Sequence, residues 1–168
     1  MLATRLRSGV ALGASLAALA ACSSPSSPAA APDAAGGVIG CANQGDTYAA
    51  NMQKPGQMGM YTFTLNQAAP APPSLNVNVW TMKIADAAGK SPDVTQLTAL
   101  PFMPLMGHGT NQTPFFTANS DGTFSVADID LFMDGLWTVT LSITTPAAGG
   151  STKGSVVDTA VYTFCIDG

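Results

Sequence analysis

Several residue types that carry chemistry in proteins are scarce or absent in this sequence. Its 168 residues include no glutamate and a single histidine, His108, and the only two arginines are Arg5 and Arg7 near the amino terminus. Without these arginines, the formal net charge of −4 becomes −6, and the four remaining lysines are scattered. Such a chain has no basic surface for a phosphate backbone, so we expect no nucleic-acid binding.

The same scarcity argues against an enzyme. No third group is identifiable beside a Ser–His pair, and a hydrolytic zinc site needs more His, Asp or Glu ligands than this chain concentrates in one place. Asp128 and Asp130 are two apart on an expected strand and therefore share one face. No aromatic-lined cleft is evident around them, so a solvated strand edge is the simpler interpretation, and we expect no catalytic residues.

The amino terminus lacks an apolar run long enough to span a bilayer stably. Residues 10–21 form a short apolar stretch behind Arg5 and Arg7, as in a secretory signal. The stretch ends in LAAC, which resembles the lipobox of bacterial lipoproteins and implies cleavage before Cys22 and lipidation of its thiol. An ordinary signal peptide with an incidental cysteine is the alternative.

By this resemblance, residues 1–21 are a lipoprotein signal peptide, and a lipid anchor at Cys22 attaches the protein to a membrane. Cys22 is followed by Ser23 and not by Asp, which by resemblance to Gram-negative lipoproteins implies the outer membrane and not retention in the inner one. We expect the domain to face the periplasm, and exposure on the cell surface is the alternative. Residues 22–37 are rich in Ser, Pro, Ala and Gly, which predicts a flexible linker. Residues 38–168 are long enough for one domain with a single core.

Helical periodicity is nearly absent beyond residue 38. In residues 136–143, Trp137, Val139, Leu141 and Ile143 share one strand face and polar residues occupy the other. Further strands are expected at 59–65, 74–84, 94–102, 115–118, 123–127 and 158–166. Seven or so short strands separated by Pro, Gly, Asn and Asp turns predict an all-β protein with a two-sheet β-sandwich, and a closed barrel is the competing architecture.

Two of these segments carry more specific expectations. In 74–84 the apolar positions change phase after Val79, which predicts a bulge or a passage from one sheet to the other. The end of 158–166 is apolar on both faces, which is typical of a central strand.

Two cysteines, Cys41 and Cys165, lie at the two ends of the domain. An even pair in an oxidising compartment predicts a disulfide, whereas two metal-binding thiols are the alternative. On the chain-entropy model, closing a loop of about 125 residues contributes roughly 4–5 kcal/mol.

The single histidine lies in an unusual octapeptide, FMPLMGHG, at residues 102–109. Pro104 presets the second position of a β-turn, which would make Met103 and Met106 neighbours. His108 can point to the same side if the following piece is extended. Thioethers suit Cu(I), and imidazole suits copper in either oxidation state.

A copper site built on Met103, Met106 and His108 leaves a position for a further sulfur. Met133 is the first candidate for that ligand, followed by Met58, Met60 and Met52. The alternative is packing, because methionine is a flexible filler that could cap one end of the sandwich.

The motif MPLMGHG, followed about 25 residues later by FMDGLW, resembles the YtkA-like domain family. DGTF at residues 121–124 resembles a D-G-x-aromatic segment that lies between these two motifs in such domains. The resemblance covers roughly residues 56–145. It implies an immunoglobulin-like sandwich exported to the cell envelope, related to FixH-like proteins associated with copper handling. By position it assigns the ligands to Met103, Met106, His108 and Met133. Some relatives carry a second histidine where this chain has Met106, which implies either a bias toward Cu(I) or a weaker site.

The sequence therefore predicts a lipid-anchored envelope protein that binds copper as a carrier or buffer. The alternative is a metal-free interaction module that docks an envelope protein on Phe102, Phe115 and Phe116, since adjacent aromatic residues in a loop can form a docking surface.

Overall fold

A computed structural model describes residues 40–146 and 155–167 of the chain. Within these residues all regular secondary structure is β-strand, and no helix there is long and apolar enough to cross a membrane. The expected signal peptide, Cys22 and the linker lie outside the described residues. The strands are β1 (Met52–Pro55), β2 (Tyr61–Ala69), β3 (Asn76–Asp86), β4 (Gln96–Met103), β5 (His108–Gly109), β6 (Phe115–Ala118), β7 (Phe124–Leu131), β8 (Gly135–Pro146) and β9 (Ser155–Ile166).

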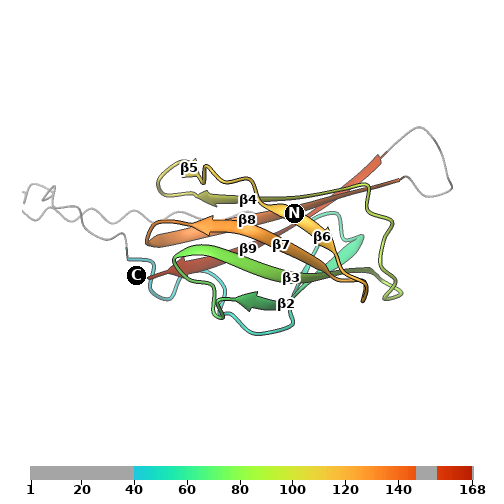
Figure 1. Cartoon of the computed structure of the whole chain (residues 1–168), viewed down its shortest axis with the longest axis horizontal. Helices are drawn as coiled ribbons and strands as arrows, with labels where there is room; N and C mark the ends of the chain where they lie inside the picture. The colour runs from blue at the N-terminus through green and yellow to red at the C-terminus, as the bar shows by residue number, and fades with distance from the viewer. Residues whose placement is uncertain (1–39, 147–154, 168) are drawn as a thin grey trace, which may run out of the picture. The chain divides into compact units, whose positions relative to one another are not determined.

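The strands form two antiparallel sheets (Figure 1), with the order β1-β2-β3-β7-β6 in one and β5-β4-β8-β9 in the other. The all-β sandwich expected from the sequence is therefore confirmed, and the competing prediction of a closed barrel is wrong. All seven expected strands are present, and β1 and β5 are two short additions to them.

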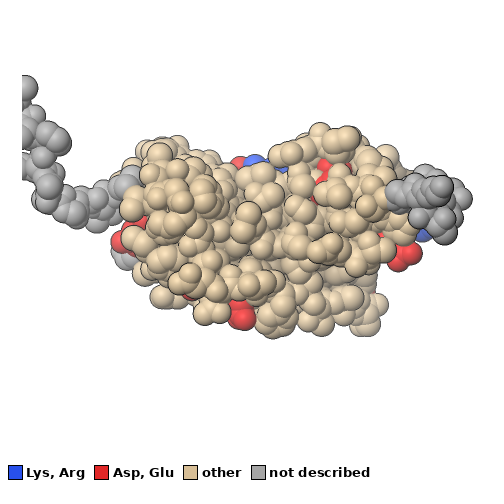
Figure 2. All heavy atoms as spheres, turned by 90° about the horizontal axis from the view of Figure 1, so that it is seen from above, with Lys and Arg blue, Asp and Glu red and all other residues tan. Residues whose placement is uncertain are grey.

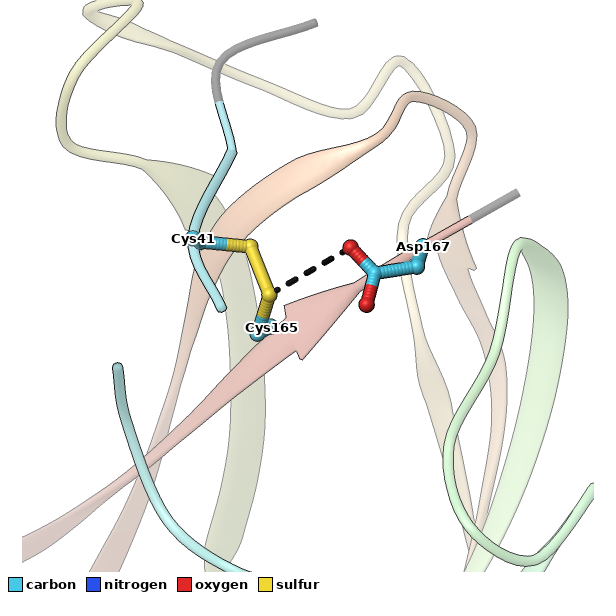
Figure 3. Close-up of side chains that lie close together, drawn as sticks. All are labelled: Cys41, Cys165 and Asp167. Atoms are coloured by element: carbon cyan, nitrogen blue, oxygen red, sulfur yellow. Dashed lines mark hydrogen bonds between the residues drawn. A yellow bond between two sulfur atoms is a disulfide. The ribbon is translucent and has the colours of Figure 1, made fainter. Parts of the chain in front are cut away.

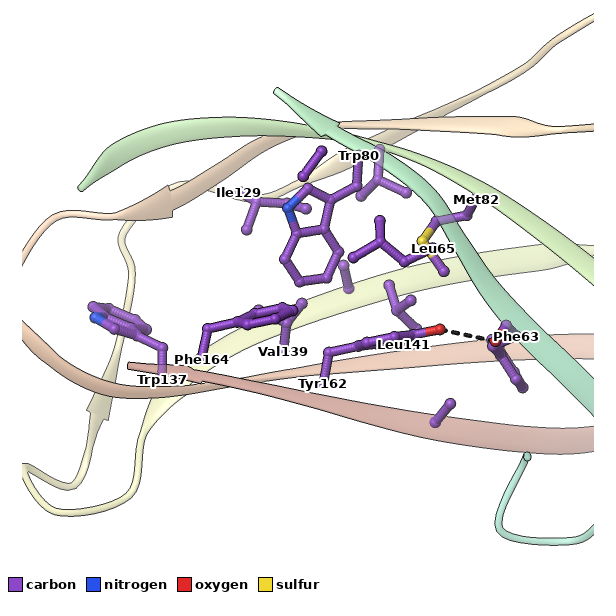
Figure 4. Packing of buried hydrophobic residues seen from close by; sticks show 14 of the residues in the cluster. Phe63, Leu65, Trp80, Met82, Ile129, Trp137, Val139, Leu141, Tyr162 and Phe164 are labelled. Carbon is purple, nitrogen blue, oxygen red and sulfur yellow. Dashed lines mark hydrogen bonds between the residues drawn. The ribbon is translucent and has the colours of Figure 1, made fainter. Parts of the chain in front are cut away.

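The core lies between the sheets and consists mainly of large apolar side chains (Figure 4). Along β8, Trp137, Val139, Leu141 and Ile143 are all buried, as their spacing predicts. Trp80 on β3 meets β9 in edge-to-face contacts with Tyr162 and Phe164, at centroid distances of 5.8 and 5.6 Å. Aromatic side chains from both sheets thus interlock across the middle of the sandwich.

The phase change expected within 74–84 is found in the neighbouring strand. On β3 every second residue from Asn78 to Ile84 is buried, and Val77 and Val79 point outward. The register between β3 and β7 shifts opposite Val79, at Asp128, whose φ is +57°. An extra residue on β7 restores its inward phase, so the prediction of a bulge was right about the place in the sheet and wrong about the strand.

The expectation that 158–166 is a central strand is wrong. β9 pairs only with β8 among the strands of its sheet and is therefore an edge strand. The segment before β1 covers part of this edge, because Asp46 N–H donates to Thr163 O (2.6 Å) and Thr163 N–H donates to the Asp46 carboxylate (2.8 Å). An edge whose backbone groups are occupied in this way is protected from pairing with another chain.

The disulfide between Cys41 and Cys165 is confirmed, with Cα atoms 5.4 Å apart. It attaches the start of the described domain to the end of β9 (Figure 3). Asp167 Oδ1 lies 3.5 Å from Cys165 Sγ. Neither sulfur of a disulfide is a thiolate, so the three side chains do not form a metal centre in this oxidised state.

Charged side chains are sparse on the face shown in Figure 2. This agrees with the low content of charged residues in the whole chain, 10%. Lys83, Lys54 and Lys90 are the lysines of the described residues, and Lys54 forms an ion pair with Asp46. These residues therefore provide no concentrated positive surface.

Candidate functional site

The octapeptide around His108 forms a tight β-hairpin between β4 and β5. Met103 and His108 are paired across the two strands. The N–H groups of Met106 and Gly107 both donate to Met103 O, at 3.2 and 2.9 Å, and Gly107 has a φ of +69° that favours glycine. The turn expected at Pro104 is present, and it holds the backbones of Met103 and Met106 close together.

His108 lies in an aromatic environment built by the adjacent strand connection. Its ring stacks on Phe132 at a centroid distance of 5.8 Å and meets Trp137 edge-on at 6.5 Å. His108 is half-buried, and its Nδ1 is 3.2 Å from Gly109 O. In the tautomer with the proton on Nδ1, that nitrogen donates to the carbonyl and Nε2 is available as a ligand.

The connection between β7 and β8 holds Met133 beside this aromatic group. Trp137 Nε1–H donates to Met133 O at 2.8 Å, and Trp137 also packs edge-on against Phe132 at 5.6 Å. The indole therefore links the loop that carries Met133 to the ring of His108. The two sequence motifs, about 25 residues apart in the chain, come together at one end of the sandwich.

The four residues expected to bind metal differ in exposure. Met103 belongs to the core and is 2% exposed, and His108 is half-buried. Met106 and Met133 are 43% and 37% exposed. Met103 is therefore part of the core packing, whereas the side chains of Met106 and Met133 are partly exposed to solvent and lie outside the core.

The reserve ligands expected from the sequence do not join this group. Asp158 contacts the backbone of Met58 and Met60 and pairs with Ile143, six residues along β8 from Trp137, or about 20 Å. The loop of Met58 and Met60 is therefore at the far end of the sandwich. Met52 lies on β1, at the edge of the other sheet.

Asp134 is a candidate that sequence reasoning missed. It directly follows Met133, and its Oδ1 is buried without a hydrogen-bond partner among the described residues. A buried unpaired carboxylate oxygen is costly and suggests a cation or an ordered water. Its position before Gly135 makes it look like an ordinary turn residue in the sequence, so only its burial reveals it.

The other sequence candidates occupy separate places. Asp128 and Asp130 flank the buried Ile129 on β7, and both are half-buried on the outer side of the strand. Of the expected docking residues, Phe115 is 54% exposed and Phe102 is also exposed, but Phe116 packs against the core. The three phenylalanines therefore do not form one exposed surface.

Together these features define a β-sandwich domain with a Met/His hairpin beside an aromatic loop at one end. No family model matches the chain, and no curated protein matches it. Two solved structures of FetP from uropathogenic Escherichia coli strain F11 are similar to it. A copper-bound variant has 17% identity and a TM-score of 0.42, over 69% of this chain and 94% of that one.

The second is the protein as isolated after expression in the periplasm, with 18% identity and a TM-score of 0.42, over 70% of this chain and 94% of that one. The sequence identities and TM-scores are too low to transfer a ligand or a function from FetP to this chain. The bound copper is a property of FetP alone.

Proposed function

We propose that this protein is a lipid-anchored cell-envelope protein whose β-sandwich binds a copper ion through the β4–β5 hairpin, as a carrier or buffer without catalysis. The observation that carries the proposal is the pairing of His108 with Met103 in a hairpin whose turn presents Met106. The neighbouring loop adds Met133 beside the same aromatic group. These are the residues for which the sequence predicts a ligand role.

The donor set suits copper better than the harder cations. Thioether sulfur is soft and neutral, so it binds Cu(I) and is a poor ligand for Mg²⁺ or Ca²⁺. Half-burial of His108 against Phe132 and Trp137 excludes water from one side of the imidazole. Met106 and Met133 are partly exposed, so an ion bound to their sulfur atoms could be reached from solvent and exchanged.

Asp134, which directly follows Met133, has a buried carboxylate oxygen without a hydrogen-bond partner among the described residues. An unpaired buried carboxylate oxygen beside Met133 lowers the free energy of a nearby positive charge. The thioethers and the imidazole favour Cu(I), and a carboxylate would extend the tolerance of the site toward Cu(II).

The cellular location in the proposal comes from the amino terminus of the sequence. A basic start, a short apolar stretch and Cys22 support export and lipidation, and the residues after Cys22 support the outer membrane. The disulfide agrees with an oxidising compartment.

A Cu(I) titration against a competing chelator tests the metal site, using the protein with its disulfide formed. His108→Ala and Met106→Leu should each weaken binding tenfold or more, which is about 1.4 kcal/mol. Met58→Leu is the matched control, because it removes an exposed thioether from the far end of the sandwich, and it should leave the affinity unchanged. Equal affinity in all four proteins would contradict the proposal.

A metal-free module that docks an envelope protein is the second candidate, favoured by the exposed Phe102 and Phe115. Replacement of both by alanine should remove docking and leave Cu(I) binding intact. The His108 and Met106 variants should do the reverse, so the two functions are separable in the same set of proteins.

A further inference from the structure

The outer face of β1, β2 and β3 contains a hollow of about 460 Å³ that lies apart from the His108 hairpin. Across the three strands, Gln53 pairs with Thr64, and Thr64 pairs with Lys83. The turn after β3 contributes one wall. The lining residues are Asn51, Gln53, Thr62, Thr64, Asn66, Lys83, Ala85, Asp86, Ala87 and Gly89.

The side chains in this hollow are almost all hydrogen-bonding groups. Three amides, two threonine hydroxyls, one ammonium group and one carboxylate are present, and there is no aromatic or large aliphatic side chain among the lining residues. A hollow with this lining offers little to an apolar ligand and much to one that presents many hydroxyl groups.

Much of this hydrogen-bonding capacity is unused. Asn66 Nδ2 donates to Asn51 Oδ1 at 3.1 Å, and Asn66 Oδ1 is buried without a partner among the described residues. Within residues 40–146 and 155–167, no side-chain hydrogen bond is formed by Gln53 or Thr62. These groups are therefore available to a ligand or to water.

Lys83 provides the positive charge among the residues that line the hollow. Among the described lysines, Lys54 is paired with Asp46, whereas Lys83 has no carboxylate within ion-pair distance in the described structure. Asp86 also lines the hollow, but its Oδ1 accepts from the N–H groups of Ala88 and Lys90, so that carboxylate oxygen is engaged in its own turn. The Lys83 ammonium is therefore the group of the lining that can bind an anion, while the Asp86 carboxylate carries the opposite charge at the turn after β3.

We propose that this hollow binds a sugar acid, a small hydroxyl-rich molecule with one carboxylate. The carboxylate contacts Lys83, and the hydroxyl groups bond to the amides and threonines across β1 and β2. The volume lies within the range of small-molecule sites, roughly 300–1,000 Å³, which suits a monosaccharide. The site is on the outer face of the five-stranded sheet, so it is independent of the proposed copper site on the other sheet.

Amide chemical shifts in NMR spectra test this site, with sodium glucuronate as the probe and glucose as the uncharged comparison. Glucuronate should shift the amide signals of β1, β2 and the turn after β3. Glucose should bind with an affinity at least tenfold lower, as measured from the same signals. Lys83→Met should weaken glucuronate binding by tenfold or more. Lys90→Met is the control, because it also removes one positive charge. Lys90 lies at the turn after β3 and outside the lining, so this change should leave glucuronate binding unchanged.

Three results would overturn the proposal. These are no localised shifts with glucuronate, an equal response to glucose, and equal binding by the Lys83 and Lys90 variants. Because Lys83 is exposed on the sheet surface, its replacement should not unfold the protein, and the spectrum of the free variant checks this. Loss of the copper site, as in His108→Ala, should leave the shifts intact.

Discussion

Asp158 is a fully buried carboxylate that fixes the loop between β1 and β2. It is 0% exposed and accepts backbone N–H groups from Met58, Met60 and Tyr61 at 2.8, 3.1 and 3.1 Å, and from Thr159 at 2.9 Å. Gly56 passes so close that an added Cβ would overlap the carboxylate. The carboxylate thus connects the start of β9 in one sheet to the start of β2 in the other.

Asp158→Asn should destabilise the fold by about 2–4 kcal/mol, because an amide NH₂ would face backbone donors and leave buried groups unpaired. A lower urea midpoint with an unchanged slope is the expected measurement. Asp93→Asn, an exposed isosteric change, is the control and should leave the midpoint nearly unchanged. Equal midpoints in the two variants would show that the carboxylate is dispensable.

Tyr162 should make the fold sensitive to alkaline pH. Burial raises the pKa of its hydroxyl, which donates to Phe63 O at 2.9 Å. In the unfolded chain this group ionises near pH 10, so its contribution to stability is fully present below about pH 10 and is lost above it, by up to about 1.4 kcal/mol per pH unit.

The free energy of unfolding of Tyr162→Phe should therefore fall less between pH 9 and 11 than that of the unchanged protein. The variant starts from a lower stability because it loses the hydrogen bond to Phe63 O. Parallel pH curves for the two proteins would contradict the assignment.

At the scale of elements, the β4–β5 hairpin depends on Gly109. A Cβ at this position would lie 2.7 Å from the carbonyl oxygen of Pro101, which is backbone and cannot rotate away. Gly109→Ala should shift β5 away from β4 and displace His108, at a cost of roughly 1–3 kcal/mol in stability.

This shift should also weaken Cu(I) binding about tenfold, or about 1.4 kcal/mol, although Gly109 is not itself an expected ligand. Competition with a chelator measures the affinity. Gly40→Ala is the control, since an added Cβ there meets no atom within 4 Å. Unchanged Cu(I) affinity in Gly109→Ala would mean that the position of β5 does not determine binding.

Strand prediction from the sequence succeeded where one alternating pattern spans a whole element. β8 is the clear example, because period-two burial and flanking turn residues are both local properties. β5 is only two residues long and contains His108-Gly109, so no periodicity could reveal it. The bulge in β7 was displaced onto β3 in the prediction, because Asn78 is buried where the sequence suggests a polar surface position.

At the scale of the whole molecule, the disulfide closes almost the entire domain. Its cysteines are 124 residues apart, so reduction should lower stability by up to roughly 4–5 kcal/mol by restoring entropy to the unfolded chain. A fall in the urea midpoint on adding a dithiol reductant is the expected result. A protein with both Cys41→Ala and Cys165→Ala should show no response to the reductant, and a response there would mean that the reductant acts elsewhere.

The sequence by itself determined the features that depend on spacing along the chain. Alternating apolar residues specify strands, Pro104 and Gly107 specify the turn, and the two terminal cysteines form the pair. These signals are local or count residues, so they survive without knowledge of the fold. Three of the candidate metal residues, Met103, Met106 and His108, lie in or beside the same local turn.

Only the tertiary structure decided the features that depend on which distant residues meet. It placed Met58 at the opposite end from His108 and made β9 an edge strand. It set Phe132 and Trp137 against the imidazole and left Asp134 with an unpaired buried oxygen. Burial and cross-sheet contact arise from the packing of segments far apart in sequence, and no spacing within a single segment encodes them.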